Sequence, residues 1–394
     1  MLSPLLHTEV QEFIQASLEE QVSVLALKKN PFPDLSWATI LNQIAAKQKA
    51  KTKLPSWFQT PNILYPSKIS LEQTSSEKTA AYKANLVSGD SLIDLTGGFG
   101  IDDYYFAQKI KQVIHCEINA ELSDIVNHNR VPLQATNIKC YQGDSTLLLK
   151  ELDQKWDWIY IDPSRRSDTK GKVFMLKDCL PNVPDLLDFY FEYTSSLLIK
   201  TAPILDISAG LLELKFVKEI HCVAVDNEVK ELLWVLEKNY TAAPEIFACN
   251  IGKTNTERFN FTLGAAFQPA YSLPKTFLFE PNAALMKSGG FEAIATAYTL
   301  EKLHPHSHLY TADEVISFPG RTFQINMLIE YSKNQMKAHL EHKTAHITTR
   351  NFPDSVESIR KKWKIKDGGS QYCFFTTNIT NEKIVLLCTK LNEL

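Results

Sequence analysis

The 394-residue sequence lacks several features that would assign it to a protein class directly. No apolar run approaches the roughly 20 residues that a membrane-spanning helix needs, so we expect no membrane protein. The net charge is only −3, which excludes a basic surface over the whole chain, and any basic patch must therefore be local. The composition is otherwise that of an ordinary globular protein, with enough length for two or more domains.

Cysteine and histidine patterns typical of metal sites and disulfides are also missing. The seven cysteines include no C-x-x-C pair, and several lie in apolar segments where a free thiol behaves as a small hydrophobic side chain. His304, His306 and His308 alternate, but Pro305 interrupts them and no cysteine or acidic cluster accompanies them. We therefore expect reduced cysteines, a cytoplasmic protein and no bound metal.

A glycine-rich turn between a predicted strand and a predicted helix is the most informative feature that is present. Segment 91–100, SLIDLTGGFG, places Asp94 at the end of an apolar run and continues through Gly97, Gly98 and Gly100. Glycine suits such a turn because it has no Cβ and lets the backbone approach a ligand closely. This order indicates the first unit of a nucleotide-binding α/β sheet, although a plain turn has the same local pattern.

Three further apolar stretches end on acidic residues, namely Glu117, Asp144 and Asp162. Parallel strands bring their carboxyl ends to one edge of a sheet, and an acid about twenty residues beyond the glycines is placed to bind ribose hydroxyls. The glycines read G-G-x-G rather than the G-x-G-x-x-G of dehydrogenases, and a carboxylate at Asp94 would repel a dinucleotide phosphate. The pattern predicts an open α/β sheet that binds a nucleotide-like ligand without a pyrophosphate.

This set of residues resembles the class I, Rossmann-like methyltransferases that depend on S-adenosylmethionine, over about residues 71–255. The resemblance implies a seven-stranded sheet and S-adenosylmethionine as cofactor. It also implies that the glycine loop holds the methionine part, Glu117 the ribose hydroxyls and Asp144 the adenine amino group. The predicted cofactor-binding residues are Asp94, Thr96, Gly97, Gly98, Gly100, Glu117, Asp144 and Ser75.

Ser75 is included because it precedes the first strand, where a segment closes over the methionine end of the cofactor in the resembled family. Thr74 or Ser75 also suits the cap of a helix with Glu77 in its first turn, and this alternative stays open. Later in the chain we expect strands at 219–225 and 243–251, with a helix at 230–238.

The fourth acid begins the motif Asp162-Pro163-Ser164-Arg165. Methyltransferases of exocyclic base amines carry Asp or Asn, then Pro-Pro and an aromatic residue, at this strand end, so the resemblance assigns the reaction to this motif. Here Ser164 replaces the second proline and Arg165 the aromatic ring, and Phe174 is a candidate for the missing ring. The predicted catalytic residues are Asp162, Pro163, Ser164 and Arg165, and the predicted substrate-binding residues nearby are Arg166, Phe174 and Lys200.

Basic residues gather near the carboxyl end, in segment 360–366, where they alternate with Trp363. This composition suits a phosphate backbone and a stacked base, and it equally suits a solvated helix end. With its Asn-Phe-Pro and Asp-Gly-Gly motifs at 351–353 and 367–369, the region resembles the THUMP-like domain of a group of predicted bacterial methyltransferases. True THUMP domains present the acceptor end of tRNA, or a structured RNA, to a methyltransferase. The RNA-binding candidates here are Arg360, Lys362 and Trp363.

We therefore predict four parts: an N-terminal helical region (1–70), a methyltransferase domain (71–255), a small ferredoxin-like α/β module (256–317) and a THUMP-like domain (318–394). The predicted function is S-adenosylmethionine-dependent methylation of a base nitrogen in a structured RNA such as tRNA or rRNA. Two alternatives remain: methylation of a protein or small molecule, and an RNA-binding protein that keeps the cofactor without turnover. The altered Asp-Pro motif favours the last alternative, and the intact cofactor residues oppose it.

Overall fold

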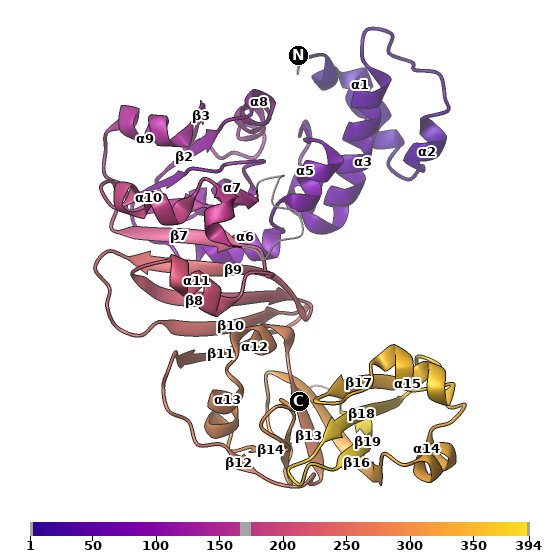
Figure 1. The fold of residues 1–394 in the computed structure, drawn as a ribbon. Coiled ribbons are helices and arrows are strands. Elements are labelled where there is room, and N and C mark those ends of the chain that lie inside the picture. The colour runs from indigo at the N-terminus through magenta and orange to yellow at the C-terminus, as the bar shows by residue number, and fades with distance from the viewer. Residues whose placement is uncertain (1–2, 166–174, 392–394) are drawn as a thin grey trace. The chain divides into compact units, whose positions relative to one another are not determined.

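The computed structural model describes residues 3–165 and 175–391 (Figure 1). The chain divides into two units, Met1–Lys218 with Glu231–Ala242, and Glu219–Lys230 with Ala243–Leu394. We describe each unit by itself. Among the described residues, no helix is both long and apolar enough to cross a membrane.

The first unit begins with short helices and continues as an alternation of strands and helices. Its N-terminal helices are α1 (Thr8–Ala16), α2 (Val22–Leu25), α3 (Trp37–Lys53), α4 (Pro55–Gln59), α5 (Lys68–Gln73) and α6 (Glu77–Ala84). The following elements are β1 (Ser91–Asp94), α7 (Ile101–Ala107), β2 (Gln112–Glu117), α8 (Ala120–Asn129), β3 (Ile138–Gln142), α9 (Ser145–Leu152), β4 (Trp158–Ile161), β5 (Ser164–Arg165), β6 (Cys179–Leu180), α10 (Val183–Tyr190), β7 (Ser196–Thr201), α11 (Ile207–Glu213) and β9 (Glu228–Glu237).

The strands of the first unit follow the order β9-β7-β4-β1-β2-β3, with β5 and β6 paired separately. The pairs from β7 to β3 are parallel, and β9 runs antiparallel to β7. The strand order reverses beside β1, and in such sheets ligands bind at the carboxyl ends of the strands near this reversal. The predicted Rossmann-like arrangement is confirmed.

The N-terminal helices pack on the start of this sheet domain through one apolar core. Ile40 and Ile44 of α3 and Trp57 of α4 are buried in a cluster that also contains Phe99 of the glycine loop and Ile125 of α8. The helical region therefore supports the same loop that the sequence singles out as the ligand site.

The predicted helix at 230–238 is wrong, because these residues form the buried strand β9. All six residues from Glu231 to Leu236 are buried. A short, continuous apolar run gives neither a helical nor an alternating period, so the sequence cannot separate a buried strand from a buried helix. The strands predicted at 219–225 and 243–251 are confirmed as β8 (Val217–Val225) and β10 (Glu245–Ile251).

In the second unit, β10 pairs with β8 in parallel and with β11 (Thr256–Thr262) antiparallel. A separate eight-stranded sheet has the order β12-β14-β15-β13-β16-β19-β18-β17. Its strands and the helices between them are β12 (Ala270–Tyr271), β13 (Phe277–Pro281), α12 (Ala283–Ser288), α13 (Phe291–Ala297), β14 (Glu301–Lys302), β15 (Tyr310–Ala312), β16 (Gly320–Glu330), α14 (Lys333–His339), β17 (His346–Arg350), α15 (Val356–Trp363), β18 (Gln371–Thr377) and β19 (Lys383–Lys390). Met336 of α14 and Ile359 of α15 lie in one core with Phe375 and Val385 of the sheet.

Candidate functional site

The glycine loop after β1 is fixed by hydrogen bonds to carboxylates on both sides. One oxygen of the buried Asp94, Oδ1, accepts hydrogen bonds from the Thr96 backbone N–H at 2.7 Å and the Thr96 hydroxyl at 3.1 Å. The Gly98 N–H donates to Glu117 Oε2 at 2.8 Å. Gly98 and Gly100 have φ values of +56° and +72°, which favour glycine. The loop therefore joins the ends of β1 and β2 at the ligand edge.

Gly97 favours glycine for a different reason, which is the lack of space for a side chain. A Cβ at this position would lie 2.2 Å from the imidazole ring of His115, which is fully buried in β2. At Gly98, by contrast, a Cβ would meet only the Thr96 carbonyl oxygen, at 3.7 Å. The glycine loop is therefore packed against the protein at Gly97 and open at Gly98, as a loop that holds a ligand must be.

Glu117 and Asp144 offer further acceptors at the same edge. Glu117 Oε1 accepts from the Asn119 N–H at 2.7 Å, so each of its oxygens binds one backbone donor and keeps a lone pair for a hydroxyl group. Asp144 caps α9, and its Oδ1 accepts from the N–H groups of Thr146 and Leu147 at 2.9 and 3.1 Å. The free acceptors fit the ribose hydroxyls and the amino group of the expected cofactor.

Two exposed apolar side chains lie next to these acids in sequence, and sequence reasoning missed them. Ile118 follows Glu117 and is 71% exposed, and Leu147 in the first turn of α9 is 58% exposed. Large apolar side chains so open to water, beside hydrogen-bonding groups, suit a planar ring that packs on them. The only signal in the sequence was their position one and three residues after the acids.

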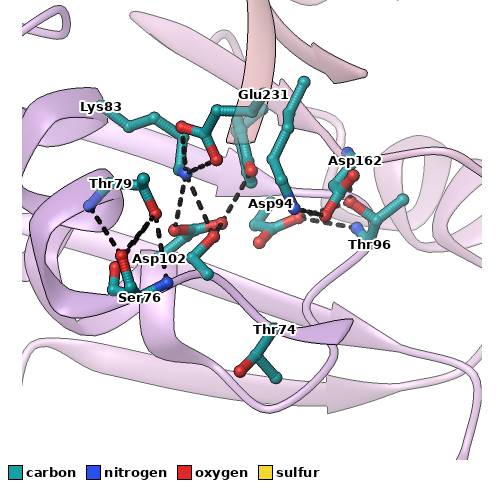
Figure 2. A network of polar contacts seen from close by, with 12 residues as sticks. Thr74, Ser76, Thr79, Lys83, Asp94, Thr96, Asp102, Asp162 and Glu231 are labelled. Carbon is teal, nitrogen blue, oxygen red and sulfur yellow. Dashed lines mark hydrogen bonds and ion pairs between the residues drawn. The ribbon is translucent and has the colours of Figure 1, made fainter. Parts of the chain in front are cut away.

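A buried network of charged residues lies at the start of α7 (Figure 2). The ammonium group of Lys83, a fully buried residue of α6, contacts both Glu231 oxygens at 2.8 Å and Asp102 Oδ1 at 3.3 Å. Asp102 Oδ2 accepts hydrogen bonds from the hydroxyls of Ser75 at 2.9 Å and Tyr160 at 2.8 Å. No local pattern in the sequence points to Lys83, Asp102 or Glu231, because α6, α7 and β9 meet only in the folded chain.

Ser75 belongs to this network. Its hydroxyl donates to Asp102 and accepts from Lys83 Nζ at 3.1 Å, and the residue is buried. Ser76, rather than Ser75, caps α6 through the Thr79 N–H. The Ser75 hydroxyl therefore anchors the segment before α6 to the start of α7. Its contact with a cofactor stays a prediction.

The network stabilises the charge of Asp102. Burial acts to raise the pKa of Asp102, but the ammonium groups of Lys83 and Lys200 outweigh it and the pKa lies below its usual value. For Glu231, burial dominates and raises the pKa, while Lys83 and Lys200 oppose it. Asp102 thus stays ionised beside the glycine loop.

A second buried cluster lies under the loop. Burial raises the pKa values of Asp94 and Asp103 well above 3.8, and the charge of Asp103 adds to the shift at Asp94. His115 Nδ1 lies 2.7 Å from Asp103 Oδ2, and burial lowers the pKa of this imidazole. Asp94 and Asp103 influence each other's pKa. Two coupled carboxyl groups in a buried site favour sharing a proton.

This cluster predicts a specific pH dependence of stability. Because the folded-state pKa values of Asp94 and Asp103 are raised, the folded protein binds more protons than the unfolded chain above about pH 4, and its free energy of unfolding falls as pH rises through the raised values. An Asp103→Asn variant removes one of these titrations. Relative to wild type it should gain about 1.4 kcal/mol for each unit by which the pKa is raised. Urea unfolding between about pH 5 and about pH 9 measures this difference, and parallel curves for the two proteins would contradict the prediction.

Asp162 stands at the carboxyl end of β4, next to the glycine loop. Its backbone N–H donates to the Thr96 hydroxyl oxygen at 2.7 Å, and its carboxylate pairs with the ammonium group of Lys200 on β7. The Asp162 side chain is 36% exposed and that of Lys200 13%. Burial acts to lower the pKa of Lys200, but Asp162, Asp102 and Glu231 outweigh it and raise the pKa, so Lys200 stays charged. The structure thus unites Asp94, Thr96, Asp162 and Lys200, as the sequence predicts.

The other residues predicted around Asp162 differ in burial and in secondary structure. Pro163 is buried, and Ser164 is exposed in β5, which pairs antiparallel with β6. Arg165 is the second residue of β5. Arg166 and Phe174 lie outside the described residues. The roles of these residues stay predictions.

The structure corrects two of the three RNA-binding candidates of the second unit. Trp363 is only 7% exposed and packs in the core under α14 and α15, so its ring is not open for stacking on a base. The Arg360 guanidinium donates to the carbonyl oxygen of Ala345 at 3.2 Å and to Asp367 at 2.5 Å, and therefore holds the local fold together. Lys362 remains exposed.

The histidine loop shows no arrangement for a metal. His304 bonds to the side chains of Asn351 and Asn381, at 3.0 and 3.3 Å. His308 stacks on Phe291, and burial lowers the pKa of His308 to about 4. No group of three His, Cys, Asp or Glu side chains in residues 3–165 and 175–391 is placed to hold a metal ion.

Comparison with known proteins places this chain among relatives over its full length. It matches a crystal structure described as a "putative methyltransferase from Porphyromonas gingivalis W83" with 31% identity and a TM-score of 0.87, covering 99% of both chains. Family models match at residues 277–319, a ferredoxin-like domain, and at residues 320–390, a THUMP domain-like module. No curated protein matches the chain.

Shorter solved structures share part of the chain only. A "putative RNA methyltransferase" from Pyrococcus horikoshii is 19% identical, with 39% of this chain and 74% of that chain covered and a TM-score of 0.27. An rRNA methylase from Streptococcus thermophilus is 15% identical, with 41% and 94% covered and a TM-score of 0.30.

Proposed function

Because this chain belongs to the family of Rossmann-like, S-adenosylmethionine-dependent methyltransferases with a C-terminal THUMP-like domain, we propose that it methylates a base nitrogen of a structured RNA. The roles assigned below to individual residues, and the four-part division of the chain at 70, 255 and 317, are part of this proposal.

The cofactor site is assigned to the carboxyl ends of β1, β2 and the loop before α9. Bound there, S-adenosylmethionine supplies a methyl group on a positively charged sulfur. The open backbone at Gly98 faces its methionine part, Glu117 accepts hydrogen bonds from the ribose hydroxyls, and Asp144 accepts one from the adenine amine. Ile118 and Leu147 pack on the adenine ring. A carboxylate-rich edge also suits a cation better than a phosphate.

The observation that carries the assignment to a base nitrogen is the position of Asp162. Its carboxylate is partly exposed at the end of β4 and pairs with Lys200, and the Asp162 backbone N–H donates to the Thr96 hydroxyl. A fixed carboxylate accepts a hydrogen bond from an amine N–H and thereby directs the nitrogen lone pair. Because methyl transfer is an in-line displacement, such positioning supplies much of the rate.

Lys200 narrows the choice of base. Beside the acceptor Asp162 it places a donor, so the pair matches an amine next to a ring nitrogen that accepts a hydrogen bond. Adenine presents this pattern at N6 and N1, and cytosine at N4 and N3. On the Watson–Crick edge of guanine, the amine lies next to an N–H donor, which would face the Lys200 ammonium, and guanine presents the matching pattern only at N2 and N3 on its sugar edge. The proposed target is therefore adenine or cytosine, presented by its Watson–Crick edge.

The test is methyl transfer from labelled S-adenosylmethionine to total RNA from a strain that lacks this protein, followed by nucleoside analysis. We expect label in a discrete RNA species, as methylated adenine or cytosine at the exocyclic nitrogen. Label in guanine would refute the proposed presentation of adenine or cytosine by its Watson–Crick edge. Label in protein or small molecules alone, or bound cofactor without any transfer, would refute the RNA methyltransferase proposal and favour one of the two alternatives.

A further inference from the structure

The matched THUMP-like region carries a local excess of positive charge. Residues 320–390 contain 12 lysines and arginines and 6 aspartates and glutamates, although the whole chain has a net charge of −3. By sequence, Arg360 and Lys362 are the two basic residues best suited to bind RNA. In the structure, Arg360 is engaged in internal hydrogen bonds, whereas Lys362 is exposed. The charge that is available to a partner must therefore be located from the structure.

A hollow of about 420 Å³ lies beside α14 and the end of α15. Its lining contains three lysines and one glutamate, so its net charge is positive, and the remaining residues are aromatic or small and polar. The lining residues are Tyr331, Ser332, Lys333, Lys337, Glu341, Lys362 and Trp363.

The three lysines are exposed and, within the described part of the chain, none of them pairs with a carboxylate. Lys333 and Lys337 follow one another on α14 at a spacing of four residues, so their side chains share one face of the helix. The Lys362 ammonium lies 3.3 Å from the Tyr331 hydroxyl and 5.3 Å from the ring centres of both Tyr331 and Trp363. Among the described residues, these positive charges thus line the hollow without a carboxylate partner.

Contacts within the domain position the aromatic wall of the hollow. The Tyr331 hydroxyl donates to Asp354 at 2.8 Å, and the Tyr331 ring packs edge-on against Phe352 and Phe375 at 4.9 and 5.9 Å. The Trp363 Nε1 lies 3.4 Å from the same hydroxyl. A fixed wall holds the Lys362 ammonium in place before a ligand arrives, which lowers the entropy cost of binding.

We propose that this hollow binds phosphate groups of the RNA substrate. The lining has three ammonium groups and one carboxylate, a net charge that two phosphodiesters balance. Lysine binds phosphate as a point charge, and such contacts position a nucleic acid without reading its sequence. The inference rests on the proposed function, because it takes the methylated RNA as the partner. It moves the RNA contact from Arg360 and the ring of Trp363 to Lys333, Lys337 and Lys362.

The experiment compares RNA binding by full-length wild type, a K333Q/K337Q/K362Q variant and a matched K253Q/K383Q/K390Q control. The control removes the same charge from exposed lysines of the same unit that lie outside the hollow. The probe is fluorescently labelled total tRNA, measured by anisotropy at several salt concentrations. We expect the hollow variant to bind about tenfold more weakly, with a salt slope reduced by about two to three units, and the control to bind much more like wild type.

Two outcomes would overturn the inference: wild-type binding by the hollow variant, or equal weakening in both triple variants. Methyl transfer to RNA separates this failure from that of the proposed function. If wild type methylates RNA and the hollow variant binds normally, only the phosphate site is wrong. If wild type neither binds nor methylates RNA, both proposals fail. We expect the hollow variant to have a raised KM for RNA and a kcat near that of wild type, because the three substituted lysines are not among the residues assigned to the reaction.

Discussion

Replacing Asp162 by alanine is expected to lower kcat/KM for methyl transfer by about 100-fold or more, while cofactor binding persists. The Asp162 carboxylate is the side-chain acceptor at the end of β4; it pairs with the Lys200 ammonium, while the Asp162 backbone N–H donates to the Thr96 hydroxyl. Without it, an amine loses the group that directs its lone pair, and a misplacement of about 1 Å can cost about 100-fold in rate. The measurement is steady-state transfer of labelled methyl groups to RNA, with S-adenosylmethionine binding followed by calorimetry.

Two further variants sharpen this test. Asp162→Asn keeps one acceptor oxygen and should retain more activity than Asp162→Ala. Asp124→Ala removes an exposed carboxylate of α8 and should leave kcat/KM unchanged. A fully active Asp162→Ala enzyme would show that the carboxylate does not position the acceptor. Loss of cofactor binding together with activity would instead place Asp162 in the cofactor site.

Replacing Lys83 by methionine should destabilise the fold by about 3–5 kcal/mol, because it leaves Glu231 and Asp102 as buried charges without their partner. Lys83 is fully buried and contacts both carboxylates, so no water can take its place without rearrangement. Urea unfolding measures the change in the free energy of unfolding. The same replacement at Lys109, which is exposed, serves as control and should cost far less.

A double variant tests the cause. Glu231→Gln removes one of the stranded charges, so Lys83→Met with Glu231→Gln should be less destabilised than the sum of the single changes. Two results would contradict this explanation: strictly additive effects of the two changes, or a loss of less than about 1 kcal/mol in the free energy of unfolding of Lys83→Met. Either would mean that the buried ion pairs contribute less to stability than their burial indicates.

The second unit shows how a sequence pattern can mislead about exposure. Lysines and arginines around Trp363 suggested an aromatic platform, but the tryptophan faces the core formed with α14 and the sheet. The position of α14 decides this, and α14 lies about 25 residues earlier in the chain. From the sequence alone, Lys333 and Lys337 gave no reason to be grouped with Lys362.

The sequence by itself determined the Rossmann-like sheet and the edge to which the proposed ligand site is assigned. Apolar strands, glycines at the turn after β1 and acids at strand ends are local signals, and backbone sterics and parallel pairing convert them into one edge that carries Asp94, Glu117 and Asp162. These residues needed no knowledge of distant contacts.

Only the tertiary structure decided which polar side chains face one another. Lys83 and Glu231 are 148 residues apart, and β9, which carries Glu231, has no periodicity that distinguishes it from a helix. The partner of Lys200, the internal use of the Ser75 hydroxyl and the burial of Trp363 likewise depend on which elements pack together. A charge survives burial only beside a partner, and the fold, rather than the neighbouring residues in sequence, supplies that partner.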